Sequence, residues 1–308
     1  MTSRANSGAS MGRPSAFKND AARTEYCRLY DEAIALSPVS VEESDVETSL
    51  GTTHVLTAGD PSKPPLVALH ALSMSSTMWL PLLPTLTGSH HVRLLDALGD
   101  MNKSVTTVVM SSPARVVDWI DEVLDTLAIE RSAFVAASLG TWMATHYAMA
   151  RPERVERLAM LGPAGIVSPQ YMKWLVEMLV KFRLRPTVSN SEWALDTFVM
   201  EKTRPRLRAD PWRPIAQQFI IGMPGFRRKL LEPRPVKCNI DRLAASGIPV
   251  LVVIPRDETL HDGPTMAQRF RQQLPHAQVE LVDAANHLVV IDRADVVAEH
   301  LQKFLGET

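Results

Sequence analysis

The sequence predicts an α/β fold in which helices flank an open, mostly parallel β-sheet, with a helical segment inserted between two of its strands. Three observations predict this class. Short apolar runs rich in Val and Leu recur along the chain, helical patterns separate several of them, and one long region has no strand-like run. Weakly alternating apolar runs are typical of strands that are buried on both faces of a parallel sheet. Alternation of such strands with helices favours right-handed crossovers between parallel neighbours.

Seven apolar runs are the candidate strands. They cover residues 53–59, 66–71, 91–100, 132–138, 154–163, 248–255 and 277–284. The clearest helix begins at Ser112 and Pro113, which suit an N-cap and a first helical position, and its apolar residues recur every three or four positions. A second helix is predicted over residues 139–149, and a third over residues 294–305 closes the chain.

Residues 168–242 break the alternation, because they contain repeated prolines and an amphipathic stretch at 171–182 that is rich in Met, Trp and Leu. We therefore predict a helical cap at 168–242, inserted into a core formed by residues 21–167 and 243–308. The cap region carries 15 Lys and Arg against 7 Asp and Glu, although the whole chain has a net charge of −1. This basic excess is either solvated surface or a feature that favours an anionic substrate.

The composition is that of an ordinary globular enzyme, with 45% hydrophobic and 22% charged residues in a chain of 308. The near-zero net charge gives no reason to expect a nucleic acid or a membrane as partner. Residues 1–20 are rich in Ser, Gly, Ala and Arg without an apolar stretch, which predicts a disordered tail rather than a secretion signal. Cys27 and Cys238 are expected to be free thiols, and we predict a cytoplasmic location.

A lone serine stands between a predicted buried strand and a predicted helix. The stretch Ala136-Ala137-Ser138-Leu139-Gly140 is close to Gly-x-Ser-x-Gly, the nucleophile elbow that presents a serine at the edge of a sheet. Small residues are needed two positions before and after the serine because backbone segments approach closely there. Ala136 stands in place of the first glycine. The alternative is that Ser138 is an ordinary helix N-cap.

The expected partners of such a serine follow it in the chain. A serine nucleophile needs a base, and the base needs a carboxylate that holds its tautomer. Asp257 and Glu258 come directly after the run 248–255, where open α/β sheets place functional loops. His287 comes after the last run and before the closing helix. This order, Ser then Asp or Glu then His, predicts Ser138 as nucleophile and His287 as base.

Stabilisation of an oxyanion requires two backbone N–H donors. We predict Leu139, directly after the serine, and Leu72, in the loop after the run 66–71. His70 in that loop is expected to be structural and to hold the loop by hydrogen bonds. Several apolar residues could pack in the core or line an acyl pocket. These candidates are Ala71, Trp174, Met178, Phe182 and Trp193.

Five segments together resemble the α/β-hydrolase fold over roughly residues 45–306, and within it the bacterial carboxylesterases of the naproxen esterase type. They are TSLGTTHVLTAGD, LVALHALSMSSTMW, DALGDMNKS, AASLGT and the Asn-His pair before the last helix. The resemblance implies a carboxylic ester hydrolase. It also assigns the role of the acid to Glu258, the first residue of the segment ETLHD, which aligns with the acid of the family. Asp257 is the alternative. We expect no metal or other cofactor, because the sequence has no Cys/His cluster with zinc spacing, no H-E-x-x-H motif and no Gly-rich phosphate loop.

Two positions depart from the family pattern, because His70-Ala71 replaces His-Gly and Ala136 replaces the first glycine of the elbow. If either position required a positive φ, alanine would cost on the order of 1 kcal/mol and displace an N–H group. We expect a serine hydrolase that cleaves a small-molecule ester through an acyl-enzyme. The alternatives are a thioesterase or lactonase, a non-hydrolytic enzyme of secondary metabolism, and a non-catalytic small-molecule receptor. The expected partner is a small-molecule ester or thioester, and the sequence makes no prediction of oligomeric state.

Overall fold

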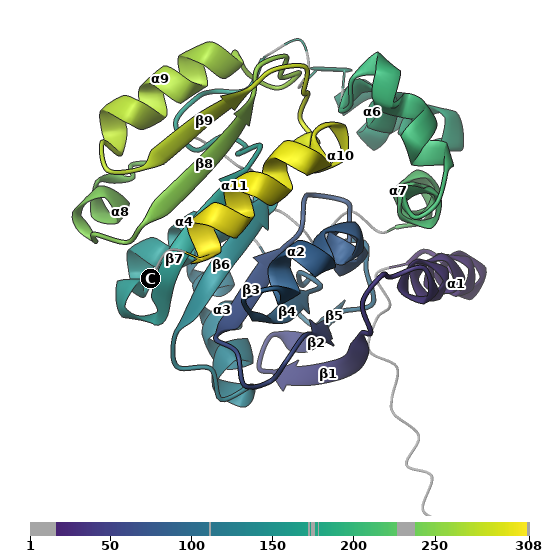
Figure 1. Cartoon of the computed structure of the whole chain (residues 1–308). Helices are drawn as coiled ribbons and strands as arrows, with labels where there is room; N and C mark the ends of the chain where they lie inside the picture. The colour runs from purple at the N-terminus through teal and green to yellow at the C-terminus, as the bar shows by residue number, and fades with distance from the viewer. Residues whose placement is uncertain are drawn as a thin grey trace, which may run out of the picture.

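The computed structural model describes residues 17–110, 112–171, 173, 176–177, 179–226 and 238–306. Its centre is a twisted β-sheet with helices on both faces (Figure 1). The strands are β1 Glu42–Thr48, β2 Gly51–Ala58, β3 Pro65–Leu69, β4 His91–Leu95, β5 Val105–Thr106, β6 Ser132–Ala137, β7 Val155–Leu161, β8 Val250–Pro255 and β9 Gln278–Val282. The strand order is β1-β2-β4-β3-β6-β7-β8-β9, and β5 pairs with β2. All pairs from β4 to β9 are parallel, which confirms the predicted mostly parallel sheet.

Alternate residues of the buried strands enter two separate hydrophobic cores, one on each face of the sheet. Val67, Leu69 and Phe134 lie in the core beneath α3 Pro113–Thr126, α4 Leu139–Ala150 and α9 Gly263–Gln273. Leu66 and Ala68 lie in the opposite core, which α2 Leu83–Thr87 and α11 Ala294–Gly306 cover. All seven predicted runs contain a strand, and the three predicted helices are present with ends that shift by one or two residues.

Several elements were not predicted, for identifiable reasons. The edge strand β1 is polar, and Val46 is its single buried residue, so it lacks an apolar run. Helix α1, Asp20–Ala35, buries only four of its residues, and two of them are the aromatic residues Tyr26 and Tyr30, so its apolar pattern is weak. The predicted strand 91–100 ends at Leu95, because the next residues form a loop held by buried carboxylates.

The residues between β7 and β8, called the insertion below, contain helices and no strand in the part that the structure describes. They form η3 Leu179–Leu184, α6 Val188–Thr197, η4 Glu201–Arg208, α7 Trp212–Gly225 and α8 Asp241–Ala245. Helix α7 packs against both α6 and the N-terminal helix α1 (Figure 1). Helix α1, which the sequence assigned to the core, therefore contributes to the same helical layer as the insertion. The division into core and cap remains a prediction.

The predicted tail at residues 1–20 is too long at its C-terminal end. Residues 1–16 lie outside the described residues, but Phe17 is buried and forms a β-bridge with Phe226. The Asn19 side chain accepts a hydrogen bond from the N–H of Ala22 at 2.9 Å and so caps α1. The apolar ring and the N-cap anchor this segment to α7 and α1.

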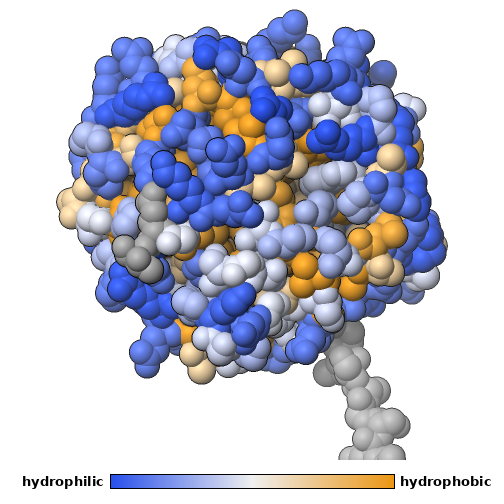
Figure 2. Space-filling view, in the orientation of Figure 1, coloured by the Kyte–Doolittle hydropathy of each residue, from blue (hydrophilic) through white to orange (hydrophobic). Residues whose placement is uncertain are grey.

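Hydrophilic side chains predominate on the face of the molecule that Figure 2 shows, and smaller apolar areas interrupt them. Most of the large apolar side chains that the described residues expose belong to the first part of the insertion, at Tyr171, Val176, Val180, Leu184 and Val188. None of the helices within the described ranges is long and apolar enough to cross a membrane.

Candidate active site

Ser138 occupies a strained turn between β6 and α4. Its φ of 49° and ψ of −114° are rare for a residue with a side chain, and such backbone strain costs on the order of 1–3 kcal/mol. Its N–H donates to the carbonyl of Leu161 in β7 at 3.1 Å. Its side chain makes no capping hydrogen bond to α4, so Ser138 is not an ordinary N-cap. This geometry is that of a nucleophile elbow.

The two alanines that replace family glycines cause no left-handed strain. Ala71 and Ala136 are both buried, and neither is among the described residues with a positive φ. The cost of about 1 kcal/mol that a positive φ would impose therefore does not apply. By contrast, Gly140 is sterically required, because a Cβ on this residue would lie 2.3 Å from the carbonyl oxygen of Leu69.

Ser138, His287 and Glu258 form a continuous hydrogen-bonded line at the carboxyl edge of the sheet. Ser138 Oγ lies 2.7 Å from His287 Nε2, and His287 Nδ1 lies 3.0 Å from Glu258 Oε2. The other carboxylate oxygen, Glu258 Oε1, accepts from the N–H of Leu260 at 2.9 Å. All three side chains are buried. A carboxylate that accepts from Nδ1–H leaves Nε2 free to take the serine proton.

The structure separates the two candidate acids. The carboxylate of Glu258 points at the imidazole, whereas Asp257 is exposed and its backbone N–H donates to the carbonyl of Ala285 at 3.0 Å. The geometry therefore supports Glu258 over the alternative Asp257. His287 and Glu258 come from the loops after β9 and β8, so the parallel sheet brings both to the edge where Ser138 lies.

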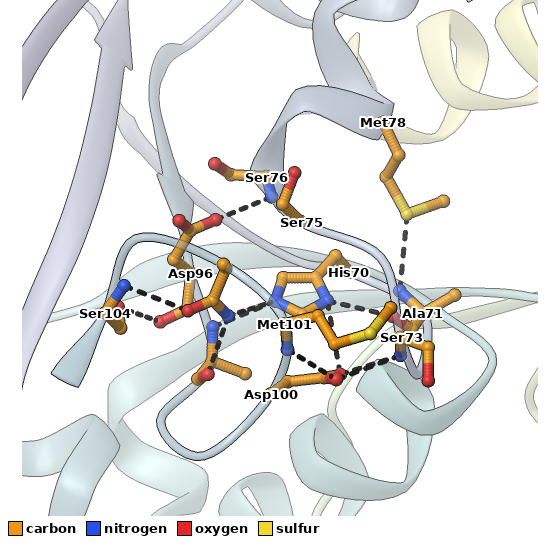
Figure 3. Close-up of polar contacts among 12 residues, drawn as sticks. His70, Ala71, Ser73, Ser75, Ser76, Met78, Asp96, Asp100, Met101 and Ser104 are labelled. Carbon is orange, nitrogen blue, oxygen red and sulfur yellow. Dashed lines mark hydrogen bonds and ion pairs between the residues drawn. The ribbon is translucent and has the colours of Figure 1, made fainter. Parts of the chain in front are cut away.

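His70 orients the peptide group that carries the expected Leu72 donor (Figure 3). The N–H of Ala97 donates to His70 Nε2 at 2.9 Å, so the ring proton is on Nδ1, which donates to the carbonyl of Ala71 at 2.9 Å. The N–H of Met74 donates to the same carbonyl at 3.1 Å. Because C=O and N–H point in opposite directions across a trans peptide, the Leu72 N–H points away from this network. His70 thus holds the loop by hydrogen bonds, as the sequence predicted.

A buried carboxylate fixes the next peptide of the same loop (Figure 3). Asp100 accepts from the N–H of Ser73, with N–O distances of 3.1 and 2.9 Å, and from the N–H of Met101 at 2.8 Å. Ser73 has a φ of 62°, which this carboxylate stabilises. Burial raises the pKa of Asp100 to about 6. Asp100 was not among the predicted site residues, although the two aspartates within the apolar run 91–100 distinguish this run from the other predicted strands.

The predicted pocket residues are only partly described. Ala71 is buried in the loop, and Trp193 is half-buried against the core with the Lys181 ammonium 2.9 Å from its ring centroid. Trp174 and Met178 lie outside the described residues, as does the side chain of Phe182. A different aromatic residue contacts the site, since the ring centroid of Phe198 lies 5.4 Å from that of His287. Nothing in the sequence around Phe198 distinguished it from a core residue.

A family model described as the alpha/beta hydrolase fold matches residues 64–294, so the chain belongs to this family. Within it, the chain is similar to the protein named uncharacterized carboxylesterase nap of Bacillus subtilis, with 27% identity over 91% of this chain and 92% of that protein. It is also 26% identical to carboxylesterase YbfK of the same organism, over 91% of this chain and 93% of that one. The crystal structure of naproxen esterase from Bacillus subtilis superposes with a TM-score of 0.84 at 25% identity, over 93% of this chain and 99% of that chain. The predicted resemblance to the naproxen esterase type is confirmed.

Proposed function

We propose that this protein is a carboxylic ester hydrolase that cleaves small-molecule esters through an acyl-enzyme on Ser138. The observation that carries the proposal is the line from Ser138 Oγ through His287 to Glu258, with distances of 2.7 and 3.0 Å. The strained backbone of Ser138 adds support, because such strain is characteristic of functional sites. The similarity to two proteins named as carboxylesterases favours an ester as substrate.

The reaction proceeds in two halves. Ser138 Oγ attacks the ester carbonyl carbon while its proton moves to His287 Nε2, and Glu258 stabilises the imidazolium that forms. The imidazolium then protonates the departing alkoxide, which leaves as the alcohol and gives the acyl-enzyme. In the second half His287 removes a proton from water while the hydroxide attacks the acyl carbon. The imidazolium then returns this proton to Ser138 Oγ as the carboxylic acid leaves. The reaction needs only these side chains and water, with no cofactor.

The N–H groups of Leu72 and Leu139 hold the oxyanion in both halves. Leu139 is the first residue of α4, where backbone N–H groups are left without intrahelical acceptors. Leu72 lies in the loop after β3. His70 holds the carbonyl of Ala71 before it, and Asp100 holds the N–H of Ser73 after it. Each such donor contributes about 2.7–4 kcal/mol of transition-state stabilisation.

The test is hydrolysis of p-nitrophenyl acetate by the wild type, Ser138→Ala and a matched control, Ser132→Ala. Ser132 is a buried serine at the other end of the same strand, where its hydroxyl donates to backbone carbonyls. We expect Ser138→Ala to lower kcat by about 10⁴-fold or more, and the control to retain it. Full hydrolysis by folded Ser138→Ala would refute the proposal.

A thioester or lactone could react at the same serine, and the basic insertion motivated the thioester alternative. In the structure, two arginines of the insertion form ion pairs within the protein. Arg208 lies 3.0 Å from Asp196, and Arg213 lies 3.1 Å from Asp210. Such pairing lowers the attraction of this region for an anionic acyl carrier, so a simple ester is favoured. Comparing hydrolysis of acetyl-CoA and an uncharged acetate ester tests this choice, and a faster reaction with acetyl-CoA would reverse it.

Two further parts of the proposal are a cytoplasmic location and a cap formed by the insertion. The free thiols of Cys27 and Cys238 suit the predicted cytoplasmic location. Phe198 of the insertion contacts the ring of His287, which supports the proposed role of the insertion as a cap over the substrate site.

A further inference from the structure

The loop that carries His287 is attached on both sides to one segment of the insertion, residues 197–200 at the end of α6. The N–H of Leu288 donates to the carbonyl of Phe198 at 2.9 Å. Asp292, the last residue of α10 Val289–Asp292, accepts from the N–H of Met200 at 3.0 Å. The same carboxylate accepts from the N–H of Asn286 at 2.8 Å. The loop at residues 286–288, called the base loop because it carries His287, therefore forms one hydrogen-bonded unit with residues 197–200.

The side-chain amide of Asn286 lies at the centre of this unit. Its Oδ1 accepts from the N–H of His287 at 2.7 Å and from the N–H of Thr259 at 2.9 Å. The Thr259 hydroxyl lies 2.8 Å from the same oxygen. Asn286 Nδ2 donates to the carbonyl of Thr197 at 2.9 Å, and this carbonyl also lies 2.8 Å from the Thr259 hydroxyl. The amide of Asn286 thus joins the base loop, the loop after β8 that carries Glu258 and Thr259, and the insertion.

These contacts place Asn286 between the backbones that carry the acid and the base. Thr259 directly follows Glu258, and Asn286 directly precedes His287. Asn286 is only 9% exposed, so water cannot easily replace the bonds it makes. An amide supplies the required acceptor and donor together, whereas alanine would leave the N–H groups of His287 and Thr259 without this acceptor.

We propose that Asn286 is a positioning residue: it fixes the backbone of His287 relative to that of Glu258 and ties both to residues 197–200 of the insertion. The inference rests on the proposed function, since it assumes that His287 acts as the base. Its consequence is kinetic. The imidazole must keep both its 2.7 Å contact to Ser138 and its 3.0 Å contact to Glu258. A misplacement of about 1 Å at such a site costs about 100-fold in rate.

The experiment measures the rate at which a fluorophosphonate probe labels Ser138, where the serine oxygen bonds to phosphorus and fluoride leaves, together with kcat and KM for p-nitrophenyl acetate, in Asn286→Ala. The matched control is Asn239→Ala. Asn239 is exposed, accepts from the N–H of Asp241 at 2.8 Å, and lies just before α8, outside the loops that carry Ser138, Glu258 and His287. We expect Asn286→Ala to lower the labelling rate and kcat about 10- to 100-fold with KM changed less than about threefold. The control should stay within about twofold of the wild type.

A second variant separates positioning from a general loss of stability. Thr259→Val removes the hydroxyl but keeps the residue's backbone N–H, and we expect a labelling rate about 3- to 10-fold lower. Because Asn286 and Thr259 contact each other, their combined loss should be smaller than the product of the single losses. Asn286→Ala combined with Asn239→Ala should give the simple product. Multiplicative losses in both pairs would contradict the proposal.

Two further outcomes are decisive. If folded Asn286→Ala is labelled within about threefold of the wild-type rate, the positioning role is refuted while the proposed function stands. If Asn286→Ala does not fold, Thr259→Val decides, and an unchanged labelling rate in that variant overturns the inference. A wild-type protein that takes up no label would instead refute the proposed function itself.

Discussion

Gly140 separates two backbone segments that carry the proposed oxyanion donors, and Gly140→Ala would force them apart. A Cβ at this position would lie 2.3 Å from the carbonyl oxygen of Leu69 and 2.9 Å from that of His70. Real Cβ contacts are essentially never below 3.0 Å, so α4 and the loop after β3 must move apart by at least about 0.7 Å. Both obstacles are backbone atoms of a buried strand end, which cannot rotate away as a side chain could.

This displacement should harm catalysis more than stability. Overpacking costs about 1–3 kcal/mol, but alanine in place of glycine inside a helix recovers up to about 1 kcal/mol, so the net loss of stability is about 0–2 kcal/mol. The Leu139 N–H lies on the α4 side of the contact and the Leu72 N–H on the loop side. A shift that disables one of them costs about 2.7–4 kcal/mol of transition-state stabilisation, or about 100- to 1,000-fold in kcat.

The assay is hydrolysis of p-nitrophenyl acetate alongside urea unfolding, for Gly140→Ala and the control Gly306→Ala. A Cβ at Gly306, near the end of α11, would meet no atom within 4 Å. We expect the control to retain full activity and stability. If Gly140→Ala keeps kcat within about threefold of the wild type, the claim that this contact sets the oxyanion geometry is wrong.

Three further predictions follow from the site. Glu258→Gln should lower kcat by about 10³- to 10⁴-fold because the imidazole loses its orienting anion, whereas Asp257→Asn should leave it unchanged; equal losses in the two variants would contradict the assignment of the acid. Ala136→Gly and Ala71→Gly should not raise kcat, and each should lower stability by about 0.5–1 kcal/mol in urea unfolding, because neither position needs a positive φ; a more active variant would oppose this view. Burial raises the pKa of Asp100 to about 6, so the folded state binds this proton more tightly than the unfolded chain, and the stabilising contribution is present near pH 4 and lost as pH rises through about 6. Relative to Asp100→Asn, the wild type should therefore lose about 2 kcal/mol of unfolding free energy between pH 4 and 7, and a difference independent of pH would contradict the role of burial.

The parts of the fold that the sequence predicted are those with a repeated local signal. Strands buried on both faces need apolar side chains throughout, so β3, β6 and β8 stand out as continuous runs. Edge strand β1 has a neighbour on one side only and remains largely exposed, so its composition is polar. The extent of the N-terminal tail was overestimated because the anchoring partner of Phe17 is Phe226, more than two hundred residues away.

The site was predictable as far as chain order and residue type determine it. Ser138 and His287 are identifiable because each follows an apolar run and their order is that of the family. The choice of Glu258 over Asp257 came from the resemblance, since both carboxylates follow the same run. The contacts of Asn286 could not be predicted, because they depend on three loops that are distant in the chain and meet only after folding.

The most direct test of the central claim is the intact mass of the wild type, Ser138→Ala and His287→Ala after treatment with a fluorophosphonate probe. An activated serine forms a stable covalent adduct with such a probe, so the readout does not depend on knowing the natural ester. We predict a single adduct on the wild type, none on Ser138→Ala, and strongly slowed labelling of His287→Ala. An unlabelled wild type, or an adduct that persists in Ser138→Ala, would contradict the account.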